Sequence, residues 1–191
     1  GQKFTIALRC PEWATNLTNE GSIFKGLFTT VNGQGVPVNY NQGYMFIERE
    51  WKQGDVISLE MPMKATIIEA NPLLEESRGQ VAVMRGPIVY CLEGQDIEPT
   101  ANGKQPKARI NDIAIPADIR LTEKKITLAG HEMIALEGDA IVTNNRARDN
   151  QTLYRTMKPI AKQKVRIRLI PYYAWDNRGS DDMSLWLPVS K

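Results

Sequence analysis

The chain has 191 residues, of which 42% are hydrophobic, and this is enough for one large β-sandwich or two small domains. Its 24 basic and 22 acidic residues nearly cancel, so nothing in the composition favours binding to nucleic acid or to an anionic membrane. No apolar run of the sequence approaches the roughly 20 residues of a membrane-spanning helix. The sequence shows no signal peptide and opens on a strand pattern, so we expect a fragment of a longer polypeptide and cannot assign a compartment.

The first third of the chain alternates between apolar and polar residues. This period of two covers residues 4–9 and 44–51 and predicts two β-strands. The tetrapeptide Lys-Gln-Gly-Asp at 52–55 predicts a hairpin turn leading to a return strand over 56–61. Asn32-Gly33 is a second strong hairpin signal.

Similar strand patterns continue to the end of the chain. A long β-branched run at 81–92 is interrupted by Arg85-Gly86-Pro87, which predicts either a bulge or two consecutive strands. Further alternating segments cover 132–136, 165–169 and 183–189, and no segment shows a sustained helical stripe. Many short strands separated by turns predict an all-β fold of antiparallel sheets, a β-sandwich of the jelly-roll or immunoglobulin-like kind.

Polar segments suggest how the strands are organised. The stretch 69–79 separates two blocks of strands and predicts a smaller N-terminal β unit followed by a larger C-terminal sandwich. Residues 95–116 are rich in Pro, Asn and Gly and are interpreted as a long surface loop with a short strand. Residues 144–158 are interpreted as a loop or a short helix.

The sequence offers few groups that could form a metal or catalytic centre. The single histidine, His131, follows a glycine at a predicted turn, and Cys10 and Cys91 are far apart, so we expect neither a zinc site nor a nucleophile with its base. The cysteines are interpreted as separate thiols, and a disulfide between them stays open. No feature brings two carboxylates together as a glycosidase requires, so no catalytic residue is assigned. Three acidic residues are interpreted as solvated loop carboxylates rather than as a calcium site: Asp176, Asp181 and Asp182.

The run from Tyr172 to Gly179 is the most suggestive for ligand binding. It combines aromatic rings, an amide and an arginine directly after a predicted strand. It predicts either a loop that contacts a sugar or a corner whose arginine bonds backbone carbonyls, and we favour the corner. The candidate carbohydrate-binding residues are Tyr173, Trp175, Asn177 and Arg178.

Several strings of the sequence resemble one family in order. Residues 8–13, Leu-Arg-Cys-Pro-Glu-Trp, are similar to the LR-x-P-x-W motif of glycoside hydrolase family 127 (GH127), once called DUF1680. Further similar segments follow along nearly the whole chain: Val31-Asn32-Gly33, Gly43-Tyr44, Glu48-Arg49, Trp51, Gly54-Asp55, Met61-Pro62-Met63, Ala70-Asn71-Pro72, Arg78 to Ala82, Arg85 to Cys91, and Tyr173 to Gly179 through Met183 and Trp186.

The resemblance implies a parent enzyme with an (α/α)6 barrel followed by β-sandwich domains. The family includes β-L-arabinofuranosidases with a zinc-bound cysteine nucleophile, whose ligands in the barrel are a glutamate and three cysteines, two of them adjacent. Cys91 has no adjacent cysteine, and no position here matches those ligands, so no cofactor is expected in this chain. The resemblance places residues 1–70 in the C-terminal part of the middle β-sandwich and residues 71–191 in the C-terminal β-sandwich.

We therefore expect a non-catalytic accessory region whose main partner is the upstream catalytic barrel of the same polypeptide. It would support that barrel, and formation of a homodimer is a further expectation. The alternative is a carbohydrate-binding module with its own glycan site. Exposed aromatic rings in a groove would favour the module, and buried ones would favour the scaffold. The glycan substrate of the parent is not specified by the sequence.

Overall fold

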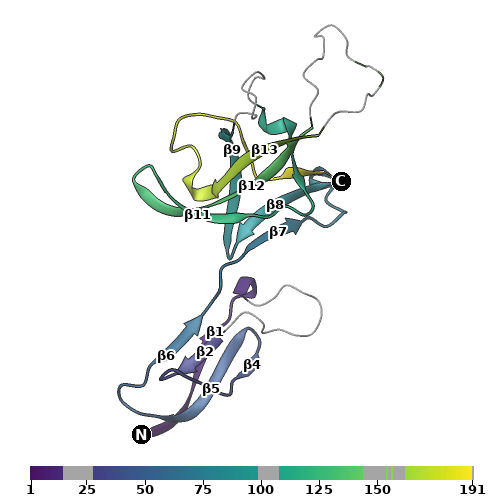
Figure 1. The fold of residues 1–191 in the computed structure, drawn as a ribbon. Coiled ribbons are helices and arrows are strands. Elements are labelled where there is room, and N and C mark those ends of the chain that lie inside the picture. The colour runs from purple at the N-terminus through teal and green to yellow at the C-terminus, as the bar shows by residue number, and fades with distance from the viewer. Residues whose placement is uncertain (15–27, 99–107, 144–153, 155, 157–161, 191) are drawn as a thin grey trace. The chain divides into compact units, whose positions relative to one another are not determined.

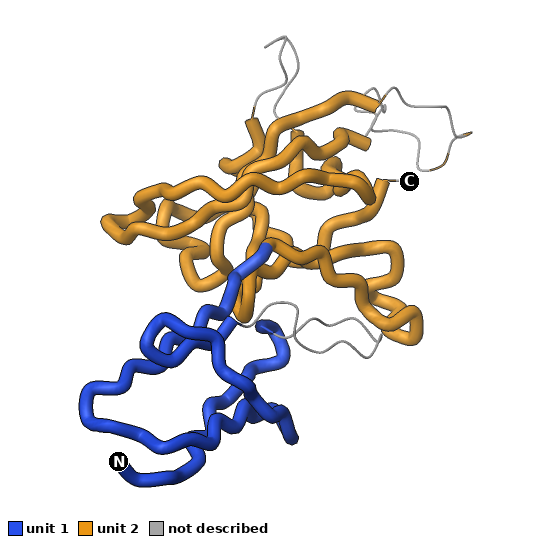
Figure 2. The backbone as a smooth tube through the Cα atoms, turned by 60° about the horizontal axis from the view of Figure 1, so that its bottom comes forward, with its two compact units in different colours: residues 1–64 blue, residues 65–191 orange. Residues whose placement is uncertain are grey.

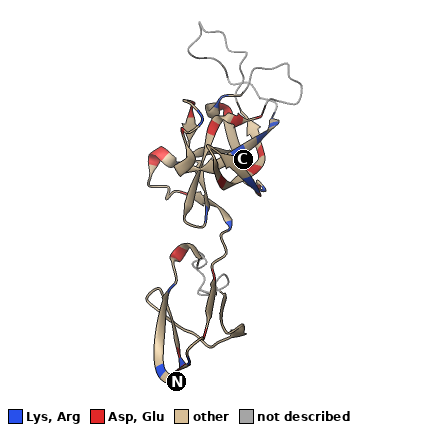
Figure 3. Cartoon of the chain, turned by 90° about the vertical axis from the view of Figure 1, so that its left-hand side faces the viewer, with Lys and Arg blue, Asp and Glu red and all other residues tan. Residues whose placement is uncertain are grey.

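The computed structural model describes residues 1–14, 28–98, 108–143, 154, 156 and 162–190 (Figure 1). The chain divides into two compact units, unit 1 (Gly1–Lys64) and unit 2 (Ala65–Lys191) (Figure 2). Strands form nearly all of the regular structure in the described residues (Figure 3), and the helical elements there are 3-10 turns of three residues each. The prediction of an all-β sandwich is confirmed. No helix in the described part of the chain is long and apolar enough to span a membrane.

Unit 1 contains two three-stranded antiparallel sheets. The first sheet has the strand order β1 (Gln2–Arg9), β5 (Tyr44–Trp51) and β4 (Asn39–Asn41), and the short turn η1 (Glu12–Ala14) follows β1. The second sheet has the order β3 (Gln34–Gly35), β2 (Phe28–Val31) and β6 (Ile57–Glu60). Both sheets contribute to one core, where Met45, Ile47 and Trp51 are buried as the alternation predicts.

The two predicted turns of unit 1 have different outcomes. Asn32 and Gly33 have φ values of 51° and 78°, the conformation of the type I′ turn that joins β2 and β3, so this hairpin is confirmed. Gly54 also has a positive φ, but the hairpin predicted at 52–55 is wrong because β6 pairs with β2 and not with β5. The turn instead carries the chain from the first sheet to the second.

Side-chain hydrogen bonds explain why this turn joins the two sheets. The Asn32 amide donates to Asp55 Oδ1 over 2.9 Å, and Asn32 Oδ1 accepts the backbone N–H of Val56 over 2.9 Å. The other Asp55 oxygen accepts the backbone N–H of Lys52. The Lys52 N–H first, and then the Asn32 amide, hold the pKa of the Asp55 carboxyl below its ordinary value. The turn at Asn32-Gly33 and the turn at Gly54-Asp55 are therefore joined by hydrogen bonds.

Unit 2 contains a nine-stranded sheet in which pairing between β8 and β9 closes six strands into a ring. The ring follows β9, β13, β12, β10, β15 and β8, with β7 and β14 at the ends of the path and β11 paired to β12. The strand bounds are β7 (Ala65–Glu69), β8 (Gln80–Arg85), β9 (Ile88–Ile97), β10 (Ile113–Pro116), β11 (Thr122–Leu128), β12 (His131–Val142), β13 (Gln163–Pro171), β14 (Met183–Ser184) and β15 (Leu187–Ser190). The 3-10 turns are η2 (Glu75–Ser77), η3 (Ile110–Asp112) and η4 (Tyr172–Ala174).

The Gly-Pro interruption in the long β-branched run separates two consecutive strands. Strands β8 and β9 form a hairpin in which Arg85 pairs with Ile88. Gly86 has a φ of 56°, which the first central position of a type II′ turn requires, and proline fits the second. Of the two alternatives drawn from the sequence, consecutive strands and not a bulge are observed.

Two expectations for the second half of the chain are corrected. The interpretation of 95–116 as a long surface loop with a short strand is correct for the short strand, which is β10, and wrong for the first residues, which belong to β9 up to Ile97. Ile113 and Ile115 of β10 are buried in the core and do not lie at the surface. The segment 183–189 is two short strands, because β14 pairs with β9 whereas β15 pairs with β8 and β10. The loop expected at 144–158 lies outside the described residues, except for Tyr154 and Thr156.

The boundary between the units lies before β7. This strand pairs with β8 from Ala65 opposite Arg85 to Glu69 opposite Val81, so it belongs to unit 2. The sequence places the boundary after residue 70, and the five residues of β7 account for most of the difference. Its apolar residues Ile67 and Ala65 pack against the unit 2 core, a contact that a local pattern does not specify.

Candidate functional site

The loop that follows β13 is fixed by a buried ion-pair cluster, here called the arginine cluster (Glu93, Asp96 and Arg178). Arg178 Nη1 donates to Asp96 Oδ1 over 2.9 Å, and Nη2 contacts both Glu93 Oε2 and Asp96 Oδ2. The side chains of Glu93 and Asp96 are only 1% and 3% exposed. The Asp96 hydrogen bonds, with those of Glu93, outweigh desolvation and raise the pKa of the Arg178 guanidinium further above its already high ordinary value. The guanidinium is therefore always charged.

Further hydrogen bonds hold the loop on both sides of the arginine. The backbone N–H of Asp176 donates to Glu93 Oε1 over 3.0 Å. The Asn177 amide donates to the carbonyls of Ala174 and Trp175, each over 3.2 Å. The predicted corner is thus present but its chemistry is corrected, since the asparagine bonds the carbonyls and the arginine bonds carboxylates. The sequence did not reveal these partners because Glu93 and Asp96 lie 85 and 82 residues from Arg178.

The fixed loop presents aromatic rings to solvent. Tyr173 is 64% exposed and Trp175 is 38% exposed. The rings of Tyr172 and Trp175 are nearly parallel, with centroids 5.9 Å apart and an interplanar angle of 12°. These three residues, here called the aromatic ledge, are exposed aromatic rings of the kind that can stack on a ligand.

The structure therefore divides the four candidate carbohydrate-binding residues into two pairs. Tyr173 and Trp175 are exposed and available to a ligand. Asn177 and Arg178 instead position the loop, because their polar groups bond the protein itself. The three acidic residues interpreted as solvated loop carboxylates are exposed: Asp176, Asp181 and Asp182.

The described residues do not assemble a zinc site or a nucleophile. No group of three or more His, Cys, Asp or Glu in the described part of the chain is arranged to hold a metal ion. Cys10 and Cys91 are free and buried, each in the core of its own unit, and His131 is exposed at a hairpin turn. These residues do not fit the zinc-bound nucleophile that the resemblance implies for the barrel, and Glu93 and Asp96 are already bonded to Arg178.

Burial makes the Cys91 thiol unreactive in the folded chain. Desolvation, with the nearby Glu93 and Asp96 charges, raises its pKa to about 12, so almost no thiolate exists at pH 8. We expect Cys91 to resist maleimide labelling for hours at pH 8 in native buffer and to react within minutes in urea. Mass spectrometry of the labelled peptide measures both rates, and rapid native labelling of Cys91 would contradict its burial.

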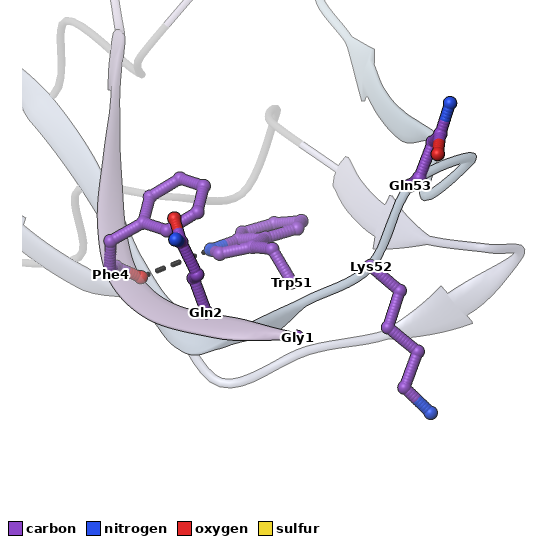
Figure 4. A pocket seen from close by; sticks show the side chains of 6 residues that line it. All are labelled: Gly1, Gln2, Phe4, Trp51, Lys52 and Gln53. Carbon is purple, nitrogen blue, oxygen red and sulfur yellow. Dashed lines mark hydrogen bonds between the residues drawn. The ribbon is translucent and has the colours of Figure 1, made fainter.

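Unit 1 has an open groove of about 450 Å³ beside its first strand (Figure 4). The groove is lined by Gly1, Gln2, Phe4, Trp51, Lys52 and Gln53. The indole N–H of Trp51 donates to the Phe4 carbonyl over 3.0 Å, and the Lys52 side chain extends away from the two rings (Figure 4). The lining residues of this groove include no carboxylate, so they supply no carboxylic acid or carboxylate base.

Two family models match the chain on either side of the structural boundary. Residues 1–63 match the model described as the beta-L-arabinofuranosidase, GH127 middle domain. Residues 65–188 match the model described as the glycoside hydrolase family 127 C-terminal domain. The junction between the matches lies where the structure separates units 1 and 2.

Individual relatives and solved structures give the same family. A non-reducing end beta-L-arabinofuranosidase from Bifidobacterium longum subsp. longum is 30% identical over 183 residues, which are 95% of this chain and 25% of that protein. A solved glycoside hydrolase is 42% identical with a TM-score of 0.80, covering 100% of this chain and 28% of the other. A GH127 beta-L-arabinofuranosidase from Geobacillus stearothermophilus T6 is 34% identical with a TM-score of 0.80, covering 99% and 27%. The chain thus spans about a quarter of the length of these relatives.

Proposed function

Because the chain belongs to glycoside hydrolase family 127 and comprises the middle and C-terminal part of its beta-L-arabinofuranosidase-like proteins, we propose that it is a non-catalytic accessory region of a larger enzyme. In this role it supports the catalytic (α/α)6 barrel that the sequence resemblance implies. Any zinc and its cysteine nucleophile would belong to that barrel. Dimerisation of the whole protein is a second part of the proposal.

The proposal rests on the polar groups of the loop that follows β13, which form hydrogen bonds within the protein. Arg178, Glu93 and Asp96 bond one another, and Asn177 bonds backbone carbonyls. Groups that fix a loop in this way stabilise a scaffold and are not free to transfer protons to a substrate.

Unit 1 supplies apolar surface that a neighbouring domain could cover. Phe4 and Tyr44 are partly exposed, and Tyr44 packs only against Phe46 among the ring contacts of the described residues. Trp13, in the family motif after β1, is half-buried. Apolar side chains of this kind at a domain surface support docking against the barrel.

The mass of the whole protein measured by light scattering tests the proposed dimer, and a monomer at all concentrations would contradict it.

We expect the isolated chain to release no product from aryl arabinofuranosides or arabinan oligosaccharides, whereas the whole protein is active. The reason is that Cys10 and Cys91 are buried in the cores of different units and that the buried carboxylates Glu93 and Asp96 are already bonded to Arg178. Product release measured by chromatography tests this, and elemental analysis of the same sample tests the accompanying absence of stoichiometric zinc. Turnover by the pure chain that a point substitution abolishes would contradict the accessory role.

The aromatic ledge favours a second candidate function, a carbohydrate-binding module. Tyr172, Tyr173 and Trp175 are exposed on a loop held by the arginine cluster. A ring held rigidly before binding loses little conformational entropy when a sugar stacks on it, and this preorganisation favours affinity. The ligand class would be an arabinose-containing glycan, as the names of the relatives suggest.

For this second function, Trp175→Ala should weaken binding of arabinan oligosaccharides about tenfold, equivalent to roughly 1.4 kcal/mol. Tyr173→Ala should have a similar or smaller effect, because its ring is the more exposed of the two. Tyr44→Ala is the matched control, since Tyr44 has the same 38% exposure as Trp175 but belongs to unit 1. Isothermal titration calorimetry measures the affinities, and equal binding by all three variants would exclude the ledge.

A further inference from the structure

A second groove, distinct in its residues from the aromatic ledge, lies on unit 2. It has a volume of about 740 Å³ and is here called the basic groove. Its lining residues come from the adjacent strands β12 and β13, from the segment between β10 and β11, and from the ends of β10 and β15 and the start of β11. The charged residues that line it are Arg120, Lys162, Lys164, Arg166, Asp118 and Asp139.

The register of β12 and β13 determines which of these charges are paired. Arg168 lies opposite Glu137 and Arg166 lies opposite Asp139, and both pairs form ion pairs. The next outward residue of β13 breaks this series, because Lys164 lies opposite Ile141. A cross-strand partner that would neutralise the Lys164 ammonium is therefore replaced by an apolar side chain.

Arg120, in the segment between β10 and β11, is a second uncompensated cation that lines the groove. Within the described residues, neither Arg120 nor Lys164 has an ion pair or a side-chain hydrogen bond. Leaving Lys162 aside, three cationic side chains line the groove against two carboxylates, and one of these pairs, Arg166 with Asp139, is already bonded over 3.3 Å. The two uncompensated cations, Arg120 and Lys164, therefore outnumber Asp118, the one remaining carboxylate of the lining.

The position of Arg120 is set by a glycine in the neighbouring strand. A Cβ atom at Gly138 would lie 3.0 Å from the Leu121 side chain, 3.1 Å from the Ile119 side chain and 3.2 Å from the Arg120 carbonyl. Gly138 therefore allows the segment before β11 to pack directly on β12, where Ile119 and Leu121 join the core. This packing holds the backbone of Arg120 at the wall of the groove.

We propose that the basic groove binds a sugar that carries a carboxylate, a uronic acid residue of an acidic oligosaccharide. Arg120 and Lys164 would bond the carboxylate, and Ile141 and Ile119 offer apolar contact to the sugar ring. Ser190 provides a hydroxyl group that can bond a sugar hydroxyl, whereas the Thr122 hydroxyl already donates to the Glu137 carbonyl over 3.2 Å. The volume falls within the range of about 300–1,000 Å³ of small-ligand sites, which favours a short saccharide over a protein partner.

The test uses the whole 191-residue chain and trigalacturonic acid as the probe. We expect backbone NMR shifts at the groove residues, an affinity that falls as sodium chloride rises from 50 to 500 mM, and no comparable shifts with neutral galactotriose. The double variant Arg120→Gln/Lys164→Gln should bind at least tenfold more weakly. The charge-preserving variant Arg120→Lys/Lys164→Arg should retain most of the affinity.

A control separates the groove from the net charge of the chain. Arg78→Gln/Lys125→Gln removes the same charge from exposed side chains outside the groove and should leave binding unchanged. Circular dichroism of each variant confirms that it is folded. The proposal is overturned if the probe produces no shifts, if galactotriose binds equally well, if the groove variant binds like the control, or if an acidic hexapeptide binds more tightly than the uronate.

Discussion

Arg178→Leu is expected to lower the free energy of unfolding of unit 2 by roughly 3–5 kcal/mol, because it leaves the buried carboxylates of Glu93 and Asp96 without their cation. The loss includes the hydrogen bonds of both carboxylates to the guanidinium. Urea unfolding of the whole chain, followed by NMR signals of unit 2, measures the change.

Two further variants identify the cause of that loss. Arg78→Leu removes an arginine whose side chain is 63% exposed and should change stability by no more than about 0.5 kcal/mol. The triple variant Glu93→Gln/Asp96→Asn/Arg178→Leu removes the buried charges together and should recover a large part of the loss. If Arg178→Leu alone costs less than about 1 kcal/mol, the cluster does not stabilise the fold as argued.

The same cluster connects stability to ligand binding. Glu93 accepts the backbone N–H of Asp176, which directly follows Trp175 of the aromatic ledge. Replacing Arg178 should therefore increase the mobility of the aromatic ledge in addition to lowering the stability of unit 2. A ledge that binds glycan through preorganised rings would lose affinity in this variant even under conditions where unit 2 stays folded.

Ile113→Ala in β10 is expected to destabilise unit 2 by about 2–5 kcal/mol, the range for truncating a fully buried isoleucine. Ile113 is 0% exposed and lies in the main core of unit 2. Leu73→Ala is the control, because Leu73 is 86% exposed and its truncation should change stability by less than about 0.5 kcal/mol. The unfolding midpoints in urea give both values, and similar small effects for the two variants would place β10 outside the core.

Much of the local structure follows from the sequence alone. Alternation predicts the buried face of β5, where Met45, Ile47 and Trp51 share one side. Asn32-Gly33 predicts the type I′ hairpin, because few other dipeptides adopt positive φ at both positions. The ordered motifs also predict the family, which the comparisons confirm. Each of these features depends on residues close together in the chain, whose conformational preferences do not need a distant partner.

Features that depend on distant partners were decided by the tertiary structure. The turn at 52–55 joins two sheets, because β6 gains β2 as its partner, and β10 becomes a core strand, because β12 and β15 flank it. Arg178 obtains its carboxylates from β9 only when the sheet brings residues more than 80 positions apart together. Local propensity decides where a strand or turn forms, whereas burial and pairing energy across the folded sheet decide which strand, and which charge, lies beside it.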